Sequence, residues 1–207
     1  MKRMLLFIGV ILFLVIVFWF VYDTGKSYEE DQDYFENATH LENKMAKANL
    51  ITTEQIREFS DAVVFGDFER VKEMVEENSE IVNIQDQYGF SALHNVMSEE
   101  QFEIVAFLIE HDADVNIRNE YGISPLHLAA YPRNAELLLN AGAVIDIIDH
   151  QGNTPLHIAA SETDDAIELV EYLISRNAPR NSKNKAGKTP LENAISAGNQ
   201  EISKALK

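Results

Sequence analysis

The 207-residue chain contains no cysteine. It can therefore form no disulfide bond, and no lipid can be attached to a cysteine side chain. The absence fits a reducing and an oxidising compartment equally well. The compartment has to be inferred from other features of the chain.

Recognisable catalytic motifs are also lacking. There is no Gly-x-Ser-x-Gly nucleophile motif, and no histidine outside the repeated frame described below has a neighbour at metal-ligand spacing. Gly25-Lys26-Ser27 is similar to the end of a phosphate-binding loop, but Phe20 replaces the first glycine of that motif. Paired acids such as Glu99-Glu100 lie in polar segments, where solvation explains them. We therefore expect no enzymatic activity, no cofactor, no metal and no small-molecule substrate.

Basic residues are scarce over most of the chain. The whole sequence has 17 Lys and Arg against 34 Asp and Glu, a net charge of −17. Residues 23–175 carry 8 basic and 32 acidic residues, a net of −24, whereas residues 176–207 carry 7 and 2, a net of +5. Such an acidic body repels nucleic acid and attracts a basic protein. The same charge also suits a surface that is merely solvated.

One uncharged run, Met4 to Tyr22, follows Lys2 and Arg3. As a helix it would be about 28 Å long, close to the thickness of the hydrocarbon core of a bilayer. The alternative is a cleaved signal peptide, whose apolar region is normally about 7–15 residues long and ends in small residues. This run instead ends in Phe18-Trp19-Phe20-Val21-Tyr22. We therefore predict an uncleaved signal-anchor transmembrane helix over residues 1–22.

The flanks of this run predict its orientation. Lys2 and Arg3 favour a cytoplasmic N-terminus, while the following segment, residues 23–41, is polar and acidic. As a flexible tether this segment would span roughly 25 Å on average. The remaining domain, residues 42–207, is then expected outside the cytoplasm, in the periplasm if the source is bacterial.

A six-residue frame recurs four times in this domain. Each copy begins with glycine and ends in Leu-His or Leu-Glu, and the copies start at Gly89, Gly122, Gly152 and Gly187, which are 33, 30 and 35 positions apart. A period near 33 residues is typical of a stacked-repeat protein. The glycines are expected in tight turns with positive φ. In the third copy, Thr154 fits a helix N-cap, Pro155 the first helical position and Leu156 the core.

At these positions the sequence resembles the ankyrin repeat family, most closely at Ser124–His127 and Thr154–His157. The resemblance implies an all-α solenoid in which each unit is a β-turn followed by two antiparallel helices, stabilised by stacking on its neighbours. It also implies hydrogen-bonding roles for His94, His127 and His157. The expected units are an atypical first repeat at about 53–86, full repeats at about 87–119, 120–149 and 150–184, and a C-terminal cap at 185–207. In the first repeat, apolar spacing predicts a helix pair that breaks at Gly66-Asp67.

The resemblance further implies that a protein partner is held by the turn tips and by the exposed face of each first helix. Carried over position by position, the candidate partner-binding residues are Tyr88, Phe90, Ser98, Glu99, Glu120, Tyr121, Ile123, Tyr131, His150, Gln151, Asn153, Glu162, Lys185 and Lys188. Large apolar groups such as Tyr88 and Tyr121 favour an interface at the tips. The alternative is that they pack on adjacent tips.

Three places depart from the family pattern. The connection Tyr131–Asn134 is about three residues short, and Pro132 is expected to end the first helix of that unit early. The fourth unit is about two residues long at Ser161–Asp165. In the first frame, Ala92 stands where proline is usual, so the capping of that unit is less certain.

Two functions are compatible with these features. One is a membrane-tethered binding module that captures a protein outside the cytoplasm; small bacterial ankyrin proteins of this plan resemble immunity proteins, which neutralise a cognate secreted toxin. The other is a structural scaffold of a membrane-associated complex. Both would use the same binding surface, so the sequence does not separate them.

Overall fold

The computed structural model describes residues 51–96 and 98–207, and the regular secondary structure of these residues is entirely helical. They belong to one compact unit, residues 51–207. No helix in this part of the chain is long and apolar enough to cross a membrane. The predicted anchor at 1–22, the tether at 23–41 and the start of the domain at residue 42 lie outside the described residues.

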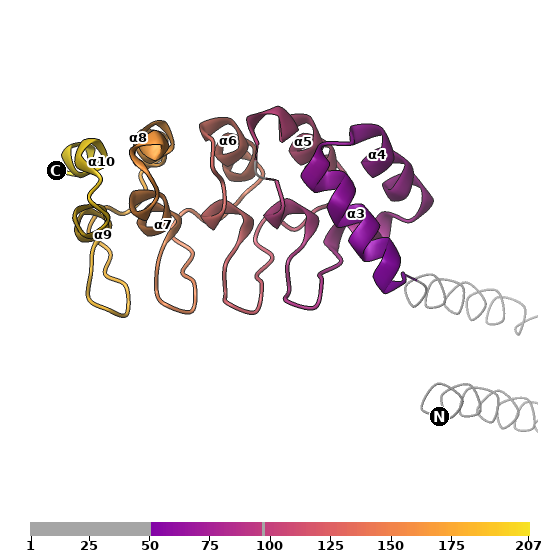
Figure 1. Cartoon of the computed structure of the whole chain (residues 1–207), viewed down its shortest axis with the longest axis horizontal. Helices are drawn as coiled ribbons and strands as arrows, with labels where there is room; N and C mark the ends of the chain where they lie inside the picture. The colour runs from indigo at the N-terminus through magenta and orange to yellow at the C-terminus, as the bar shows by residue number, and fades with distance from the viewer. Residues whose placement is uncertain (1–50, 97) are drawn as a thin grey trace, which may run out of the picture. The chain divides into compact units, whose positions relative to one another are not determined.

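Five successive units of helical elements make up the stack (Figure 1). The second helices α4, α5, α6, α8 and α10 follow one another along one edge, and the connecting turns project from the opposite edge. The elements are α3 (Thr53–Phe65), α4 (Phe68–Glu77) and η1 (Ser79–Asn83); η2 (Ala92–His94), η3 (Glu99–Gln101) and α5 (Phe102–Glu110); η4 (Pro125–His127) and α6 (Pro132–Asn140); α7 (Pro155–Ser161), η5 (Asp164–Ala166) and α8 (Ile167–Ser175); and α9 (Pro190–Ala197) and α10 (Gln200–Ala205).

The first unit forms as its apolar spacing predicts. Thr52 caps α3 in a capping box with Gln55, whose side-chain oxygen accepts the Thr52 backbone N–H at 2.9 Å. Gly66 ends α3 in the left-handed conformation, with φ of +74°. Asp67 then begins α4 by accepting a hydrogen bond from the backbone N–H of Arg70 at 3.1 Å. The predicted break at Gly66-Asp67 is confirmed.

The predicted register of the later units is also confirmed. Pro155 is the first residue of α7, and Leu126 and Leu156 are buried in the core. Ala159 and Ala160 are buried where α7 packs closely against α9. Their small side chains allow this close approach, so two neighbouring units share one continuous core.

The first helices of the second and third units are much shorter than those of their neighbours. Each is a single 3-10 turn, η2 and η4, whereas α7 and α9 have 7 and 8 residues. In the third unit the chain leaves η4 and reaches α6 through Tyr131, which is extended at φ −127° and ψ 145°. Pro132 is the first residue of α6. The first helix thus ends early, as the short connection predicts.

Candidate protein-binding surface

Each turn tip is built around one Asp or Asn side chain. In the first tip, Asp86 Oδ1 accepts hydrogen bonds from the backbone N–H groups of Tyr88 at 2.8 Å and Phe90 at 2.9 Å. The same pair of bonds recurs in the other tips, at Asn119, Asp149 and Asn184. Because one side-chain oxygen holds two main-chain groups, each tip has a defined shape without regular strand structure.

Glycine is required at the tips for two reasons. Gly89 has φ of +80°, a conformation that residues with a Cβ rarely adopt. A Cβ there would also lie 2.9 Å from the Cα of Asn119 in the next tip. The predicted positive φ is confirmed at all four frame glycines, which have φ values of +80°, +74°, +78° and +75°.

Main-chain hydrogen bonds join each tip to the next. The backbone N–H of Glu120 donates to the Tyr88 carbonyl at 3.2 Å, and that of His150 donates to the Tyr121 carbonyl at 2.9 Å. The last such bond runs from Lys185 to Gln151 at 2.9 Å. We refer to the four bonded tips, residues 86–90, 119–123, 149–153 and 184–188, as the tip row. These bonds fix the side chains of one tip relative to those of its neighbours.

Three buried histidines hold the tip row against the helical elements. In the best-formed example, Nδ1 of His157 accepts the backbone N–H of Thr154 at 3.2 Å, and the Thr154 hydroxyl lies 2.9 Å from the same nitrogen. Since a backbone N–H only donates, Nε2 carries the ring proton and donates to the Lys188 carbonyl at 3.1 Å. His127 and His94 bond to the carbonyls of Asn153 and Ile123 in the same way.

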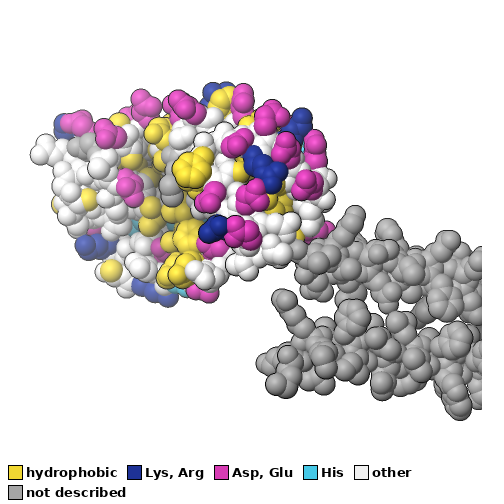
Figure 2. Space-filling view, turned by 45° about the vertical axis from the view of Figure 1, so that its right-hand side comes forward, with side chains coloured by type: hydrophobic (Ala, Val, Ile, Leu, Met, Phe, Trp, Pro, Cys, Tyr) yellow, Lys and Arg dark blue, Asp and Glu magenta, His cyan; other side chains and the backbone are white. Residues whose placement is uncertain are grey.

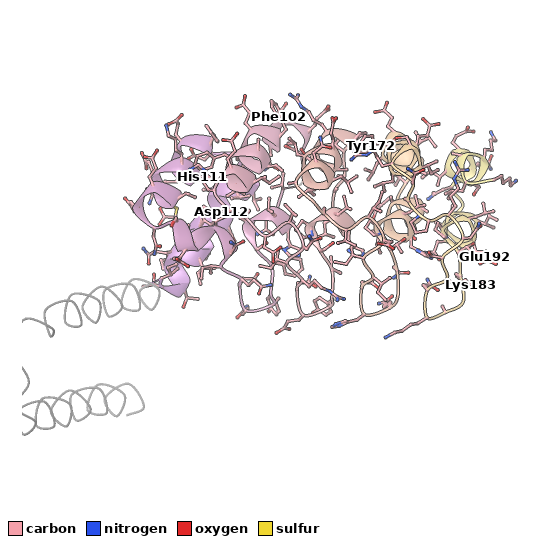
Figure 3. All side chains as sticks on the ribbon, turned by 180° about the vertical axis from the view of Figure 1, so that it is seen from behind. Phe102, His111, Asp112, Tyr172, Lys183 and Glu192 are labelled. Carbon is pink, nitrogen blue, oxygen red and sulfur yellow. The ribbon has the colours of Figure 1, made fainter. Side chains whose placement is uncertain are left out.

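These contacts keep the three rings neutral. Burial lowers the pKa of His94, His127 and His157, although the carbonyl that each Nε2 contacts partly opposes this effect. The fifth unit has Glu192 at the equivalent position (Figure 3), where hydrogen bonds from the backbone and hydroxyl of Thr189 lower the pKa of the carboxyl group. The histidines therefore have the structural roles that the family resemblance implies.

Most of the sequence-predicted partner-binding residues lie at the surface. Tyr88 and Tyr121 are 51% and 55% exposed on the tip row, and Tyr131 is 39% exposed at the start of α6. The other exposed members of the set are Glu99, Glu120, His150, Gln151, Glu162, Lys185 and Lys188. The tip row thus presents aromatic side chains over its first half and basic side chains at its C-terminal end.

The structure removes Asn153 from this set. Asn153 is only 7% exposed. Its amide nitrogen donates to Asp149 Oδ2 at 3.0 Å, and its oxygen accepts from Asn184 at 2.8 Å. It therefore joins two tips, and its burial leaves little of it for a partner to contact. The expectation that Asn153 faces solvent is wrong because its burial depends on a contact with a residue in the next unit.

Three other predicted residues are only half-buried. Phe90 lies edge-on to the ring of His94, with centroids 5.6 Å apart, so part of its side chain packs inside its own unit. The backbone N–H of Ile123 donates to Asn119, and its carbonyl accepts the proton of His94. Ser98, which follows η2, has its carbonyl bonded to Asn134 at 3.1 Å. These residues have less surface to offer than Tyr88 and Tyr121.

A second line of exposed residues runs along the C-terminal ends of the first helical elements. The side-chain amide of Gln101 donates to the Val63 and Val64 carbonyls, both at 2.7 Å, and Asn199 donates to the Ala160 carbonyl at 3.0 Å. With the Asn134 contact to Ser98, these bonds tie the ends of the first elements in the first, second and fourth units to the residues that begin the second helical part of the next unit. We refer to Val64–Phe65, Ser98, Tyr131 and Glu162 as the first-helix row.

The most exposed large apolar side chain of the described residues, Phe65, is missing from the sequence prediction. It is 83% exposed at the end of α3. The first unit lacks the repeated frame, so no position there was carried over from the family. A helical projection places it off the buried face, because at 3.6 residues per turn Phe65 lies about 160° from the buried Val63 and about 120° from the buried Phe59.

The surface around the first three tips and the first-helix row is acidic. Figure 2 shows apolar side chains exposed among acidic ones on the face turned to the viewer. No Lys or Arg occurs in residues 73–117 or 134–175. Arg118 lies between these two ranges, and its guanidinium donates hydrogen bonds to the carbonyls of Gly122 and Ile148, at 3.1 and 2.6 Å. Arg133 lies over the ring of Phe102, 3.3 Å from its centroid (Figure 3 labels Phe102). Most of the acidic side chains therefore lack a basic neighbour.

The comparison with known families agrees with this geometry. A family model described as ankyrin repeats, in three copies, matches residues 59–149 and again residues 132–207. The two matches together extend over more than half of the chain. Ankyrin repeats are in general non-catalytic modules for protein–protein interaction. The repeated frame, the bonded tips and the family match together show that this chain belongs to the ankyrin repeat family.

Proposed function

We propose that this protein captures a partner protein on its tip row and first-helix row, and that it does so without catalysing a reaction. The observation that carries the proposal is the exposure of Tyr88 and Tyr121 on tips that main-chain hydrogen bonds join, together with the exposure of Phe65 at the end of α3. Large aromatic groups contribute strongly to binding when a partner covers them. A surface that is already ordered also loses little conformational entropy on binding.

The charge of the surface favours a basic partner. The acidic residues around the two rows are largely exposed, and opposite charges speed the encounter of two proteins. Reversing Glu99, Glu120 and Glu162 to lysine is therefore expected to slow association and to weaken its dependence on salt. Truncating Tyr88 or Tyr121 is expected to speed dissociation instead.

A matched pair of variants tests this proposal. The full-length chain is used to capture proteins from its source membranes, in parallel with Tyr88→Ala/Tyr121→Ala and with Ile195→Ala. Ile195 is 59% exposed on α9 and belongs to neither row, so it controls for the loss of exposed apolar area elsewhere. A partner that is retained by Ile195→Ala and lost with the double tyrosine variant supports capture on the tip row. Equal retention by both variants contradicts it.

We also propose that residues 4–22 anchor the protein in a membrane, with the repeats on the extracytoplasmic side. The support is the uncharged run after Lys2 and Arg3 and the acidic segment that follows it. A reporter that is active only outside the cytoplasm, fused after Lys207, is expected to be active. Activity of a cytoplasm-specific reporter at the same site, or a mature N-terminus near residue 25, contradicts this topology.

Within this setting we propose an immunity role, in which the captured protein is a secreted toxin. The support is a rigid acidic binding surface together with a sequence that predicts a membrane anchor. Deleting the gene is then expected to make cells sensitive to a toxin made by their own kin, and the Tyr88→Ala/Tyr121→Ala variant is expected not to restore protection. Loss of a membrane-associated complex without any toxin sensitivity indicates the scaffold role instead.

A further inference from the structure

The third unit has an open stretch of main chain where the fourth unit has a helix. We refer to residues 128–131, between η4 and α6, as the open segment. The corresponding residues of the fourth unit belong to α7, where Ala160 is completely buried; its counterpart Ala130 is exposed. The shortened first element therefore leaves Ala130 and Tyr131 exposed, whereas Ala129 stays buried in the core.

Several main-chain groups of the open segment have no hydrogen-bond partner within the described part of the chain. The N–H of Leu128 donates to the Pro125 carbonyl, and the carbonyl of Tyr131 accepts from Ala135, both at 3.1 Å. The N–H groups of Ala129, Ala130 and Tyr131, and the carbonyls of residues 128–130, make no such bond. Unpaired main-chain groups are what an extended peptide uses when it binds alongside another chain.

A buried side chain next to the open segment also has an unfilled hydrogen-bonding position. Asn134, in the first turn of α6, is 2% exposed, and its amide nitrogen donates to the Ser98 carbonyl. Its oxygen has no partner among the described residues. An unsatisfied buried acceptor costs free energy.

The surroundings of the open segment are aromatic and acidic. Tyr131 closes the segment, and the first-helix row continues from it to the exposed Phe65 in one direction and to Glu162 in the other. Glu99 and Glu100 are exposed beside Ser98. The basic side chain nearest in sequence, Arg133, is stacked on Phe102. The charge of the site thus selects Lys and Arg in whatever binds there.

We propose that the open segment binds a short basic part of the partner in an extended conformation. The proposal rests on the proposed capture function and specifies the form of the partner. The main chain of the bound peptide pairs with Ala130 and Tyr131, its apolar side chains cover Tyr131, and its basic side chains face Glu99 and Glu162. A helix does not fit this role, because its own main-chain groups are already paired.

A selection from random peptides tests this inference directly. The full-length chain, in nanodiscs, is used to select short peptides, and the tightest peptide is then used as the probe. We expect selected sequences in which Lys or Arg alternate with apolar residues. We expect the bound peptide to slow hydrogen exchange at the amides of Ala130 and Tyr131 by about tenfold or more. Tyr131→Ala is expected to weaken binding by about tenfold.

Tyr88→Ala is the matched control, because it removes the same side chain from the tip row. The inference is overturned if Tyr88→Ala abolishes peptide binding, Tyr131→Ala leaves it unchanged, and the bound peptide does not slow hydrogen exchange in the open segment. That result would still agree with capture of the partner on the tip row. Selected peptides with helical spacing, or no enrichment at all, also overturn the inference. Tyr131→Ala can also abolish peptide binding while the tip variants leave capture of the natural partner unchanged. That outcome supports peptide binding at the open segment and contradicts capture on the tip row.

Discussion

Acid is expected to weaken the stack through its three buried histidines. His94, His127 and His157 are neutral in the folded protein, and burial lowers the pKa of each below the ordinary value of 6.5. The unfolded chain therefore binds protons more readily than the folded one in this range. The stabilising contribution is fully present above pH 6.5 and is lost as pH falls from 6.5 through the lowered pKa values.

The size of the effect follows from the number of rings. Each ring that is neutral when folded and protonated when unfolded contributes about 1.4 kcal/mol per pH unit to the slope of stability against pH. Three rings give a slope of about 4 kcal/mol per pH unit at most. The lowered pKa of Glu192 also makes the folded protein less stable in acid. The stability that its carboxylate contributes is lost only as pH falls below about the ordinary glutamate value of 4.5. The two steps therefore occupy different pH ranges.

Urea denaturation of residues 51–207 at a series of pH values between 7.5 and 5, an interval of about 2.5 pH units, measures this slope. His157→Gln is the informative variant, because Gln55 and Gln101 already accept the backbone N–H of Thr52 and Ser98 in the same way. We expect lower stability near pH 7.5, since the bond to Lys188 is lost, and a slope smaller by about 1.4 kcal/mol per pH unit, so that the difference from the natural sequence shrinks toward pH 5. A stability that is flat between pH 7 and pH 5, or an unchanged slope in the variant, refutes this reasoning.

Three further predictions follow from the packing. Leu156→Ala is expected to lower the free energy of unfolding by about 2–5 kcal/mol, against much less for Pro155→Ala, and a loss within about 0.5 kcal/mol for Leu156→Ala would contradict the register. Gly89→Ala is expected to cost more stability than Gly187→Ala, because both have positive φ but only at Gly89 does a Cβ meet the next tip; equal losses in thermal unfolding would contradict the close approach. Tyr121→Ala is expected to leave the melting temperature nearly unchanged and to cost about 2 kcal/mol or more in partner binding, measured as faster dissociation; unfolding of the domain would show that the ring is part of the packing.

The sequence predicts those parts of the fold that depend on local chemistry. Gly89 and its counterparts need positive φ within one turn, and Thr154 and Pro155 begin a helix at their own positions. The first helix pair and its break at Gly66 follow from apolar spacing alone. In each case the residues that decide the structure lie within a few positions of one another, so a pattern in the chain is sufficient.

The candidate site is less predictable because it depends on contacts between units. Asn153 is a tip residue by its position, but a bond from Asn184, 31 residues later, buries it. The short first element of the second unit is followed by a contact with the preceding unit. There the side-chain amide of Asn95 donates a hydrogen bond to the Ser60 hydroxyl at 3.3 Å. Phe65 lies outside every copy of the frame. The burial of Asn153 and the short first element have no signal within one repeat, and Phe65 has one only in the helical spacing of α3.

The hydrogen bonds between tips have a consequence for how this surface can evolve. The frame glycines are 33, 30 and 35 residues apart, yet every tip bonds to the next through the same main-chain positions. Insertions and deletions are absorbed by the connections between helices, as in the short Tyr131–Asn134 and the long Ser161–Asp165. Since main-chain bonds do not depend on side-chain identity, residues such as Tyr121 and Gln151 are free to change without altering the spacing of the tips. A lineage can therefore exchange one partner for another by point substitutions at the tips while the scaffold beneath them stays the same.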